Sequence, residues 1–456
     1  MNRSPMFGDM EAQRHWMEIT THLPLGDWYR NTTDNDLLYW GLDYPPLTAF
    51  HEWLMGSIVQ RIYPEMIALH TSRGFETDTS VLIMRLSVLL SDCLVYIPAC
   101  VLFVTTCLRQ CSKSIQRRTL CALLLSPSLL LIDHAHFQYN SVCLGLVLLA
   151  IVAIDADFDC LGSFLFVMAI GYKQIALYYS LAFFVYLLMK CVRRRSLSHL
   201  IAIASTVLLS FALLFLPFCL FHAPNTSCID GLISVVKRMF PWDRGLFEDK
   251  VASFWCTTNT LVKWNLRFSR DQLKTACLLT TLAAISPSLG MLAIRPSVKS
   301  FGYTLFSCAI SFFLFSYQVH EKTILFPLLP LILSFVESPE VALFFEFVAS
   351  FSMIPLYVKD ANLLPAFAYT LAFYFCFHSA ASVPFTRWDR LNRWIVRMLI
   401  VMMCLLSLYY TVPPPSRYPD LHSVLISAFS FSVFSLYYFL VLRLQYNELN
   451  LKHKEE

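Results

Sequence analysis

Clusters of ionisable and aromatic residues interrupt an otherwise apolar chain at four places. The first cluster runs from Gly8 to Thr20 with the sequence GDMEAQRHWMEIT, and Asp9 stands at its start. Helical spacing would bring Arg14 beside Glu18, four residues further on. Ionisable groups next to apolar membrane segments are costly, so we take Asp9 and Arg14 as candidate functional residues. An amphipathic surface helix is the alternative interpretation.

The second cluster, YWGLDYPPLT, places the carboxylate of Asp43 among aromatic residues. Pro45 and Pro46 fix the backbone that follows, and Pro45 favours an extended conformation of Tyr44. Aromatic rings in such a setting can stack on the apolar face of a sugar, while the carboxylate accepts hydrogen bonds from its hydroxyl groups. The pattern predicts a sugar-binding segment around Asp43, with a simple turn as the alternative.

The third cluster, DHAHFQYN, occupies residues 133–140 between two apolar runs. Its closely spaced polar side chains predict a cavity lined by His134, His136 and Gln138. Polar caps on two helix ends are the alternative. A His-x-His pair could contribute to a metal site, but two histidines alone are too few for zinc, so we expect no metal here.

The fourth cluster is cationic. It combines Arg244 with the triplet His320-Glu321-Lys322, which lies between two apolar runs. Arginine and lysine beside histidine suit a phosphate anion, and Lys173, between two further apolar runs, is another candidate anion contact. Snorkelling of long cationic side chains toward the membrane surface is the alternative.

The composition indicates the kind of scaffold that must position these clusters. The chain has 456 residues, of which 57% are hydrophobic and 14% are charged, whereas about a quarter of the residues of a soluble domain are charged. A net charge of +4 gives no support to nucleic-acid binding. The 15 cysteines show no C-x-x-C pair, so we expect small buried residues rather than a zinc site or a disulfide framework.

Apolar runs recur along most of the chain after residue 80, and many approach the length of about 20 residues that spans a bilayer. We therefore expect an all-α polytopic membrane protein with about thirteen segments, at 81–108, 119–133, 142–157, 158–172, 174–190, 197–222, 276–294, 301–317, 323–337, 341–358, 363–385, 394–412 and 422–442.

The orientation follows from links rich in lysine and arginine, at 109–118, 190–195 and 387–397. The positive-inside rule assigns them to the cytosol. Counting crossings places 318–322 on the opposite, lumenal side. It also predicts a first lumenal loop at 1–80, membrane segments at 81–222, a second lumenal loop at 223–275, further membrane segments at 276–442 and a cytosolic tail at 443–456.

Short motifs agree with this orientation. Asn31 and Asn225 head glycosylation sequons, and both fall on the predicted lumenal side. The C-terminus ends in KHKEE, which is similar to a dilysine-type retrieval signal. A solvated charged tail is the alternative for that end.

Together, the clusters offer carboxylates, aromatic rings and cations at one membrane face. A carboxylate could deprotonate an incoming hydroxyl group, and cations could stabilise a departing lipid phosphate. Attack from the opposite face of the ring would invert the anomeric carbon and needs no metal or cofactor. A transporter or lipid flippase is the alternative, and it predicts charges along a path at mid-membrane depth.

Longer motifs carry a family resemblance. The chain resembles the dolichyl-phosphate-glucose-dependent glucosyltransferases of asparagine-linked glycosylation through the segments GDMEAQRHWMEITTHLPL, YWGLDYPPLTAFH, LIDHAHFQYNSV, GYKQIALYY, FPWDRGLFEDKVASFWC and SYQVHEKTILFPLLP. These segments cover the chain from Gly8 to about Pro330 in family order. The first two favour the branch that adds the first glucose over the sister branch that adds the second.

The resemblance implies a GT-C-type fold in the endoplasmic reticulum membrane, with a lumenal active site, inversion and no metal. It also implies dolichyl phosphate glucose as donor and a dolichol-diphosphate-linked Man9GlcNAc2 oligosaccharide as acceptor. Asp9 would be the general base, Asp43 would position a sugar, and His320, Lys322 and Arg244 would surround the donor phosphate. The family has a membrane helix before the first loop, which we expect to be absent here; an inactive truncated form is a further alternative.

Overall fold

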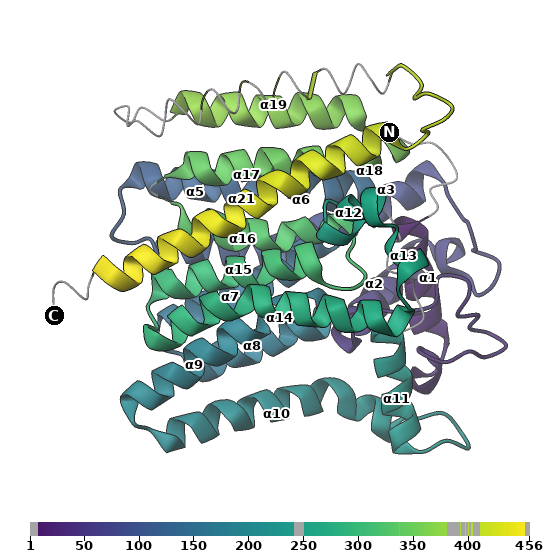
Figure 1. The fold of residues 1–456 in the computed structure, drawn as a ribbon. Coiled ribbons are helices and arrows are strands. Elements are labelled where there is room, and N and C mark those ends of the chain that lie inside the picture. The colour runs from purple at the N-terminus through teal and green to yellow at the C-terminus, as the bar shows by residue number, and fades with distance from the viewer. Residues whose placement is uncertain are drawn as a thin grey trace. The chain divides into compact units, whose positions relative to one another are not determined.

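The computed structural model describes residues 8–240, 250–336, 338–380 and 411–451, together with isolated positions between 393 and 404. All regular structure in these described residues is helical (Figure 1). The chain forms two compact units that are each discontinuous in sequence. The first comprises Met1–Leu108, Ile132–Leu177 and Ser196–Arg244, and the second comprises Arg109–Leu131, Tyr178–Arg195 and Gly245–Glu456.

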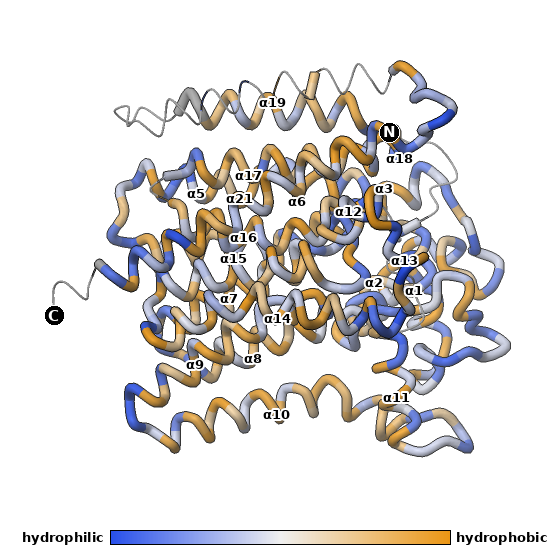
Figure 2. The backbone as a smooth tube through the Cα atoms, viewed as in Figure 1, coloured by the Kyte–Doolittle hydropathy of each residue, from blue (hydrophilic) through white to orange (hydrophobic). Residues whose placement is uncertain are grey.

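The expected helical membrane organisation is confirmed, whereas the count of thirteen segments is not. Among the described residues, seven helical segments are long and apolar enough to cross a bilayer: Asp78–Thr106, Lys113–Phe137, Gln174–Arg194, Leu197–Leu220, Arg270–Ile294, Val298–Phe315 and Leu421–Asn450. Shorter apolar helices occupy Asn140–Asp155, Asp159–Tyr172 and Leu363–Phe377. Apolar residues dominate the long helices (Figure 2).

Two expected spans are shorter or divided in the structure. The segment expected at 323–337 contains only a ten-residue helix, α16 (Leu325–Ser334), and the segment at 341–358 is divided into α17 (Pro339–Ser352) and α18 (Ile354–Lys359). Proline stands in the first turn of α17 and of α18, where its missing N–H costs nothing. Most of the segment expected at 394–412 lies outside the described residues.

The first unit contains the elements that carry most of the candidate residues. Its helices are α1 (Asp9–His22), α2 (Pro46–Ile62), α3 (Asp78–Ser91), α4 (Ile97–Thr106), α7 (Asn140–Asp155), α8 (Asp159–Tyr172), α10 (Leu197–Leu220) and α11 (Cys228–Met239). A π-helical turn at Asp92–Tyr96 joins α3 to α4, and a second π-helical turn at Leu131–Phe137 precedes α7.

Helices α7 and α8 form a tight antiparallel pair. Only residues 156–158 separate them, with Asp157 at a φ of 64°, and α8 packs in turn against α10. The first residue of α7 and the residue after α8 therefore lie at the same end of the unit. At the other end, Asp159 pairs with His199 of α10, with 2.8 Å between Oδ2 and Nε2. This arrangement brings Asn140 and Lys173 together.

The first loop forms its own core. Trp16 and Trp28 are each only 4% exposed and pack in a cluster that includes Leu42 and Phe218. Trp40 and Trp53, in contrast, are 40% and 47% exposed. Two of the four tryptophans therefore fill the core of the folded loop, and the other two remain at its surface.

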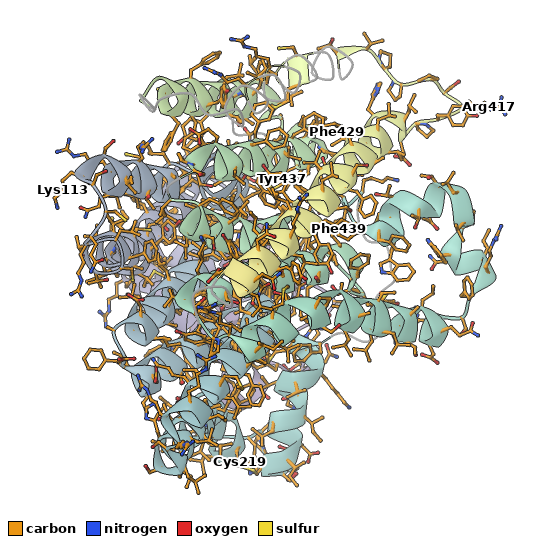
Figure 3. All side chains as sticks on the ribbon, turned by 60° about the vertical axis from the view of Figure 1, so that its left-hand side comes forward. Lys113, Cys219, Arg417, Phe429, Tyr437 and Phe439 are labelled. Carbon is orange, nitrogen blue, oxygen red and sulfur yellow. A yellow bond between two sulfur atoms is a disulfide. The ribbon has the colours of Figure 1, made fainter. Side chains whose placement is uncertain are left out.

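A disulfide between Cys219 and Cys228 links the end of α10 to the start of α11 (Cys219 is labelled in Figure 3). The two helices approach closely, since a Cβ on Gly231 would lie 2.2 Å from the carbonyl oxygen of Phe218. The expectation of no disulfide is wrong at this pair, whose spacing of nine residues matches no short motif. Disulfides persist in oxidising compartments such as the endoplasmic reticulum lumen.

The second unit is a helical assembly around an aromatic core. Besides α16, α17 and α18, its helices are α5 (Lys113–Leu124), α6 (Pro127–Leu130), α9 (Ser180–Arg194), α12 (Phe254–Val262), α13 (Trp264–Arg267), α14 (Arg270–Ile294), α15 (Val298–Phe315), α19 (Leu363–Ala380) and α21 (Leu421–Leu451). The long helix α21 packs against α15 and α17. Phe345 of α17 contacts Phe434 and Tyr437 of α21, and Tyr437 is labelled in Figure 3.

Candidate active site

Asp9 is the first residue of α1, and it follows Gly8 at a φ of 103°. A residue with a side chain would be strained in that conformation, so glycine allows the chain to turn into the helix. The Asp9 carboxylate is 25% exposed, and His136 holds it with 3.0 Å between Nε2 and Oδ2. Gln138 Nε2 donates a second hydrogen bond to the same oxygen. Two residues of the DHAHFQYN cluster thus orient a reachable carboxylate.

Lys173 fixes the orientation of Gln138. Its ammonium donates hydrogen bonds to Gln138 Oε1 at 3.0 Å and to Asn140 Oδ1, and the Tyr44 hydroxyl also donates to Gln138 Oε1 at 3.3 Å. Because two donors occupy the amide oxygen, the amide nitrogen must face Asp9. Lys173 is only 4% exposed. A lysine buried to this degree is better placed to orient neighbouring side chains than to contact a substrate anion.

Asp133 secures the segment that carries these side chains. Its carboxylate accepts hydrogen bonds from Asn140 Nδ2 at 2.8 Å and from the Ser141 backbone N–H at 2.7 Å. It therefore satisfies the first turn of α7, where a negative charge is favourable. Phe137, which lies between the two hydrogen-bond partners of Asp9 in the sequence, is buried and has a φ of 88°. Such strained conformations persist only where the surroundings enforce them, and here the turn presents His136 and Gln138 to one carboxylate.

The Asp43 segment meets the Asp9 segment at Tyr44. Burial raises the pKa of the Tyr44 phenol well above its ordinary value, and the negative charges of Asp9 and Asp43 raise it further. The Tyr44 ring also lies 4.9 Å from the Lys173 ammonium and 4.9 Å from the ring of Trp16. Both carboxylates therefore act electrostatically on the Tyr44 hydroxyl, which connects the Asp43 segment to Gln138. Tyr44 was not among the predicted site residues, although it adjoins Asp43.

Backbone contacts hold the Asp43 segment in place. Arg238 of α11 donates hydrogen bonds to the carbonyl groups of Gly41 and Leu42 at 2.6 and 3.0 Å. Gln174 Nε2 donates to the carbonyl group of Asp43 at 3.3 Å. Helix α11 and the 3₁₀ helix Gln174–Tyr179 therefore both position the first loop.

The guanidinium of Arg14 is occupied by contacts within the protein. Its guanidinium donates five hydrogen bonds, to Glu11 twice, to Glu18, to Ser72 and to the Met66 carbonyl, at 2.7–3.0 Å. An arginine side chain has five N–H donors, so this network leaves none for a sugar or a phosphate. The expected contact between Arg14 and Glu18 is present, but the geometry does not support the idea that Arg14 binds substrate.

Glu18 should make this network sensitive to acid. Burial raises its pKa, but the hydrogen bond and charge of His15, the charge of Arg14 and the His70 backbone N–H outweigh burial and lower the pKa from 4.5 to about 2. The resulting stabilisation, about 3 kcal/mol, is complete above pH 4.5 and is lost as the pH falls toward 2. We expect the thermal stability of the detergent-solubilised chain to fall over this range and to fall less in Glu18→Gln. An equal fall in both proteins would contradict this assignment.

His134 points away from Asp9. Its Nε2 atom lies 2.7 Å from Oδ2 of Asp92, so the two π-helical turns of the unit meet through this pair. His134 and His136 therefore do not converge on one point. Among the described residues there is no group of three or more histidine, cysteine or acidic residues that could hold a metal ion.

The remaining cationic candidates lie elsewhere in the chain. His320 precedes a short 3₁₀ helix, Glu321–Ile324, that leads into α16 of the second unit, and His320 and Lys322 are both half-buried. The His320 carbonyl accepts hydrogen bonds from the backbone N–H and the hydroxyl of Thr323. Arg244 lies outside the described residues.

Both predicted glycosylation sites have exposed asparagines, Asn31 in the first loop and Asn225 at the α10–α11 turn. If both loops face the lumen, each site should accept a glycan. We expect Asn31→Gln and Asn225→Gln each to remove one step of the mobility shift that peptide-N-glycosidase produces, and the double variant to remove the whole shift. An unshifted wild-type chain would remove this support for a lumenal first unit.

Comparisons with known proteins identify the family of the chain. The model of the ALG6, ALG8 glycosyltransferase family matches residues 3–440. The Gallus gallus protein named dolichyl pyrophosphate Man9GlcNAc2 alpha-1,3-glucosyltransferase is 44% identical over 471 residues, which cover 96% of this chain and 91% of the relative. The Mus musculus protein of the same name is 42% identical with the same coverage. An Arabidopsis thaliana protein named as a probable enzyme of this kind is 39% identical over 449 residues, with 95% and 83% coverage. The chain therefore belongs to the ALG6, ALG8 glycosyltransferase family.

Proposed function

We propose that this chain transfers glucose from dolichyl phosphate glucose to Man9GlcNAc2 carried on dolichyl pyrophosphate, forming an α-1,3 linkage. The observation that carries the proposal is the Asp9 carboxylate, which is partly exposed and is oriented by His136 and Gln138. The names of the relatives support the acceptor and the linkage. Family membership confirms the expected GT-C-type glycosyltransferase, and the donor follows from the resemblance of the motifs.

The reaction proposed for this site is a single displacement. Asp9 accepts the proton of the acceptor hydroxyl group as that oxygen attacks the anomeric carbon of glucose. The bond from the anomeric carbon to the phosphate oxygen breaks, and dolichyl phosphate leaves with the electron pair. Attack from the opposite face inverts the anomeric carbon, so an α product requires a β-linked glucosyl phosphate.

Several residues have supporting roles in this proposal. Lys173 and Tyr44 orient the Gln138 amide, which in turn orients the base. Asp43 binds hydroxyl groups of a sugar beside Tyr44. His320, Lys322 and Arg244 supply positive charge to the departing phosphate, as the resemblance implies, because cations aligned with developing negative charge stabilise the transition state.

We also propose that the reaction takes place on the lumenal side of the endoplasmic reticulum membrane. The disulfide Cys219–Cys228 supports an oxidising compartment for the end of the first unit where Arg238 contacts the Asp43 segment. The two exposed sequons belong to the same unit.

The experiment that tests the proposal supplies the full chain, in detergent, with radiolabelled dolichyl phosphate glucose and a lipid-linked oligosaccharide. We expect one glucose to be added to Man9GlcNAc2 and none to the acceptor that already bears one glucose. Transfer only to the glucosylated acceptor would indicate the second-glucose reaction. In sealed vesicles, sugar flux without any glucosylated product would indicate a transporter and overturn the proposal.

A further inference from the structure

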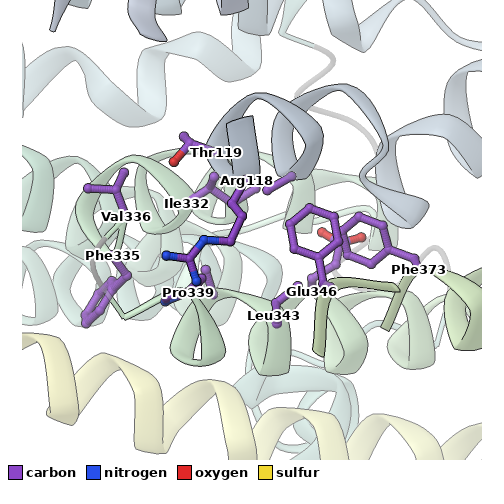
Figure 4. A pocket seen from close by; sticks show the side chains of 12 residues that line it. Arg118, Thr119, Ile332, Phe335, Val336, Pro339, Leu343, Glu346 and Phe373 are labelled. Atoms are coloured by element: carbon purple, nitrogen blue, oxygen red, sulfur yellow. The ribbon is translucent and has the colours of Figure 1, made fainter. Parts of the chain in front are cut away.

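A pocket in the second unit is lined by an unusual combination of one cation and many apolar side chains. It lies among α5, α16, α17 and α19. Its apolar lining includes Ile332, Phe335, Leu343, Phe373 and Phe377. Figure 4 shows the Arg118 side chain of α5 reaching among these groups, between Phe335 and Phe373.

Two donor atoms of the Arg118 guanidinium have no acceptor in the described part of the chain. Its Nε and Nη1 atoms are buried and have no hydrogen-bond partner among the described residues. The one carboxylate in the lining, Glu346, is engaged elsewhere, because it accepts hydrogen bonds from the Ser126 hydroxyl at 3.1 Å and the Ser128 backbone N–H at 2.7 Å. A buried charged donor without an acceptor is costly. The pocket therefore presents unused donors to an anionic ligand.

The place of Arg118 in the chain indicates where such a ligand would come from. Lys113, Arg117 and Arg118 stand at the start of α5, which begins the membrane segment Lys113–Phe137. The positive-inside rule assigns this end to the cytosolic face, where anionic lipids gather and basic pockets between membrane helices bind lipid headgroups. A small soluble anion would match the guanidinium but leave the aromatic walls without a partner.

We propose that this pocket binds an anionic phospholipid of the cytosolic leaflet. The phosphate accepts hydrogen bonds from Nε and Nη1 of Arg118, in the side-by-side geometry that suits guanidinium and phosphate. An acyl chain packs against Phe335, Phe373 and Phe377. The site is independent of the glucosyl-transfer chemistry proposed for Asp9.

The test measures phosphatidylinositol binding to the full chain in a non-ionic detergent, by native mass spectrometry, with phosphatidylcholine for comparison. We expect a preference for phosphatidylinositol and at least a tenfold loss of apparent affinity in Arg118→Gln. The matched control is Arg117→Gln, which removes the same charge from the exposed neighbouring position and should change the affinity less than twofold. Equal losses in the two variants, or no lipid preference in the wild type, would overturn the proposal.

A second variant keeps Arg118 and fills the space. Ala122 lines the pocket on the next turn of α5, and Ala122→Leu should weaken phosphatidylinositol binding without lowering the melting temperature measured in the absence of added lipid. If Arg118→Gln and Ala122→Leu both bind phosphatidylinositol as the wild type does, the pocket is not the site. Binding of dolichyl phosphate but not phosphatidylinositol at Arg118 would overturn the assignment to a bilayer phospholipid.

Discussion

Asp9→Asn should lower glucosyl transfer by about 10²–10⁴-fold while the protein remains folded in the membrane. The substitution keeps the shape of the side chain and the two donors that contact it, His136 and Gln138, but an amide cannot accept the proton of the acceptor hydroxyl group. The turnover rate should therefore fall much more than the apparent affinity for either substrate. Initial rates at several concentrations of dolichyl phosphate glucose measure this difference.

Asp78→Asn is the matched control for this experiment. Asp78 is the first residue of α3, as Asp9 is of α1, and its side chain is exposed. Each substitution removes one negative charge from the first turn of a helix, so both lose a similar interaction with the helix dipole. Only Asp9→Asn should lose activity. Full turnover by Asp9→Asn would show that another group is the base, and equal losses in both variants would indicate a general effect of charge.

Arg14→Leu should produce the largest loss of stability. Removing the guanidinium leaves Glu11 and Glu18 buried without their cation and removes the bonds to Ser72 and Met66. Breaking a buried ion pair by removing one partner typically costs about 3–5 kcal/mol, which is a large part of the stability of a domain. We expect the first loop to become sensitive to protease at temperatures where the wild type is resistant.

The control for Arg14 is Arg61→Leu, at an exposed position in the last turn of α2. It removes the same type of side chain from the same loop and should change the protease resistance little. If Arg14→Leu were as resistant as this control and still inactive, the guanidinium would have a role in catalysis or binding rather than in stability.

The membrane scaffold could be predicted from the sequence because long apolar helices are a local property of composition. The limits of such local patterns appear at α16 and α17, which are shorter than the expected spans. The contact between Arg14 and Glu18 follows from helical spacing. Its structural role depends on Ser72 and Met66, more than fifty residues away, and no local pattern shows that the guanidinium is fully occupied.

The arrangement of the site shows a similar limit. Asp9, Gln138 and Lys173 could be named from motifs, but they come from three separate elements. Only the packing of α7 against α8 shows that Lys173 reaches Gln138 and Asn140 rather than open solvent. The disulfide Cys219–Cys228 depends likewise on the close approach of α10 and α11. The hydrophobic pattern places each helix in the membrane but does not give its neighbours.

The modest length of α7 and α8 has a consequence for how the lipid donor is handled. With 16 and 14 residues, the two helices are only about 24 and 21 Å long, whereas the hydrocarbon core of a bilayer is about 30 Å thick. If the turn that connects α7 and α8 lies at one membrane surface, Asn140 and Lys173 at the other end of the pair lie several ångströms inside the opposite surface, unless the bilayer becomes thinner around them. In both cases Asn140 and Lys173 would lie at or just inside the membrane surface, which is the level of a lipid phosphate headgroup. The hydrocarbon tail of the proposed dolichyl phosphate glucose donor could then stay in the bilayer while the glucose is transferred.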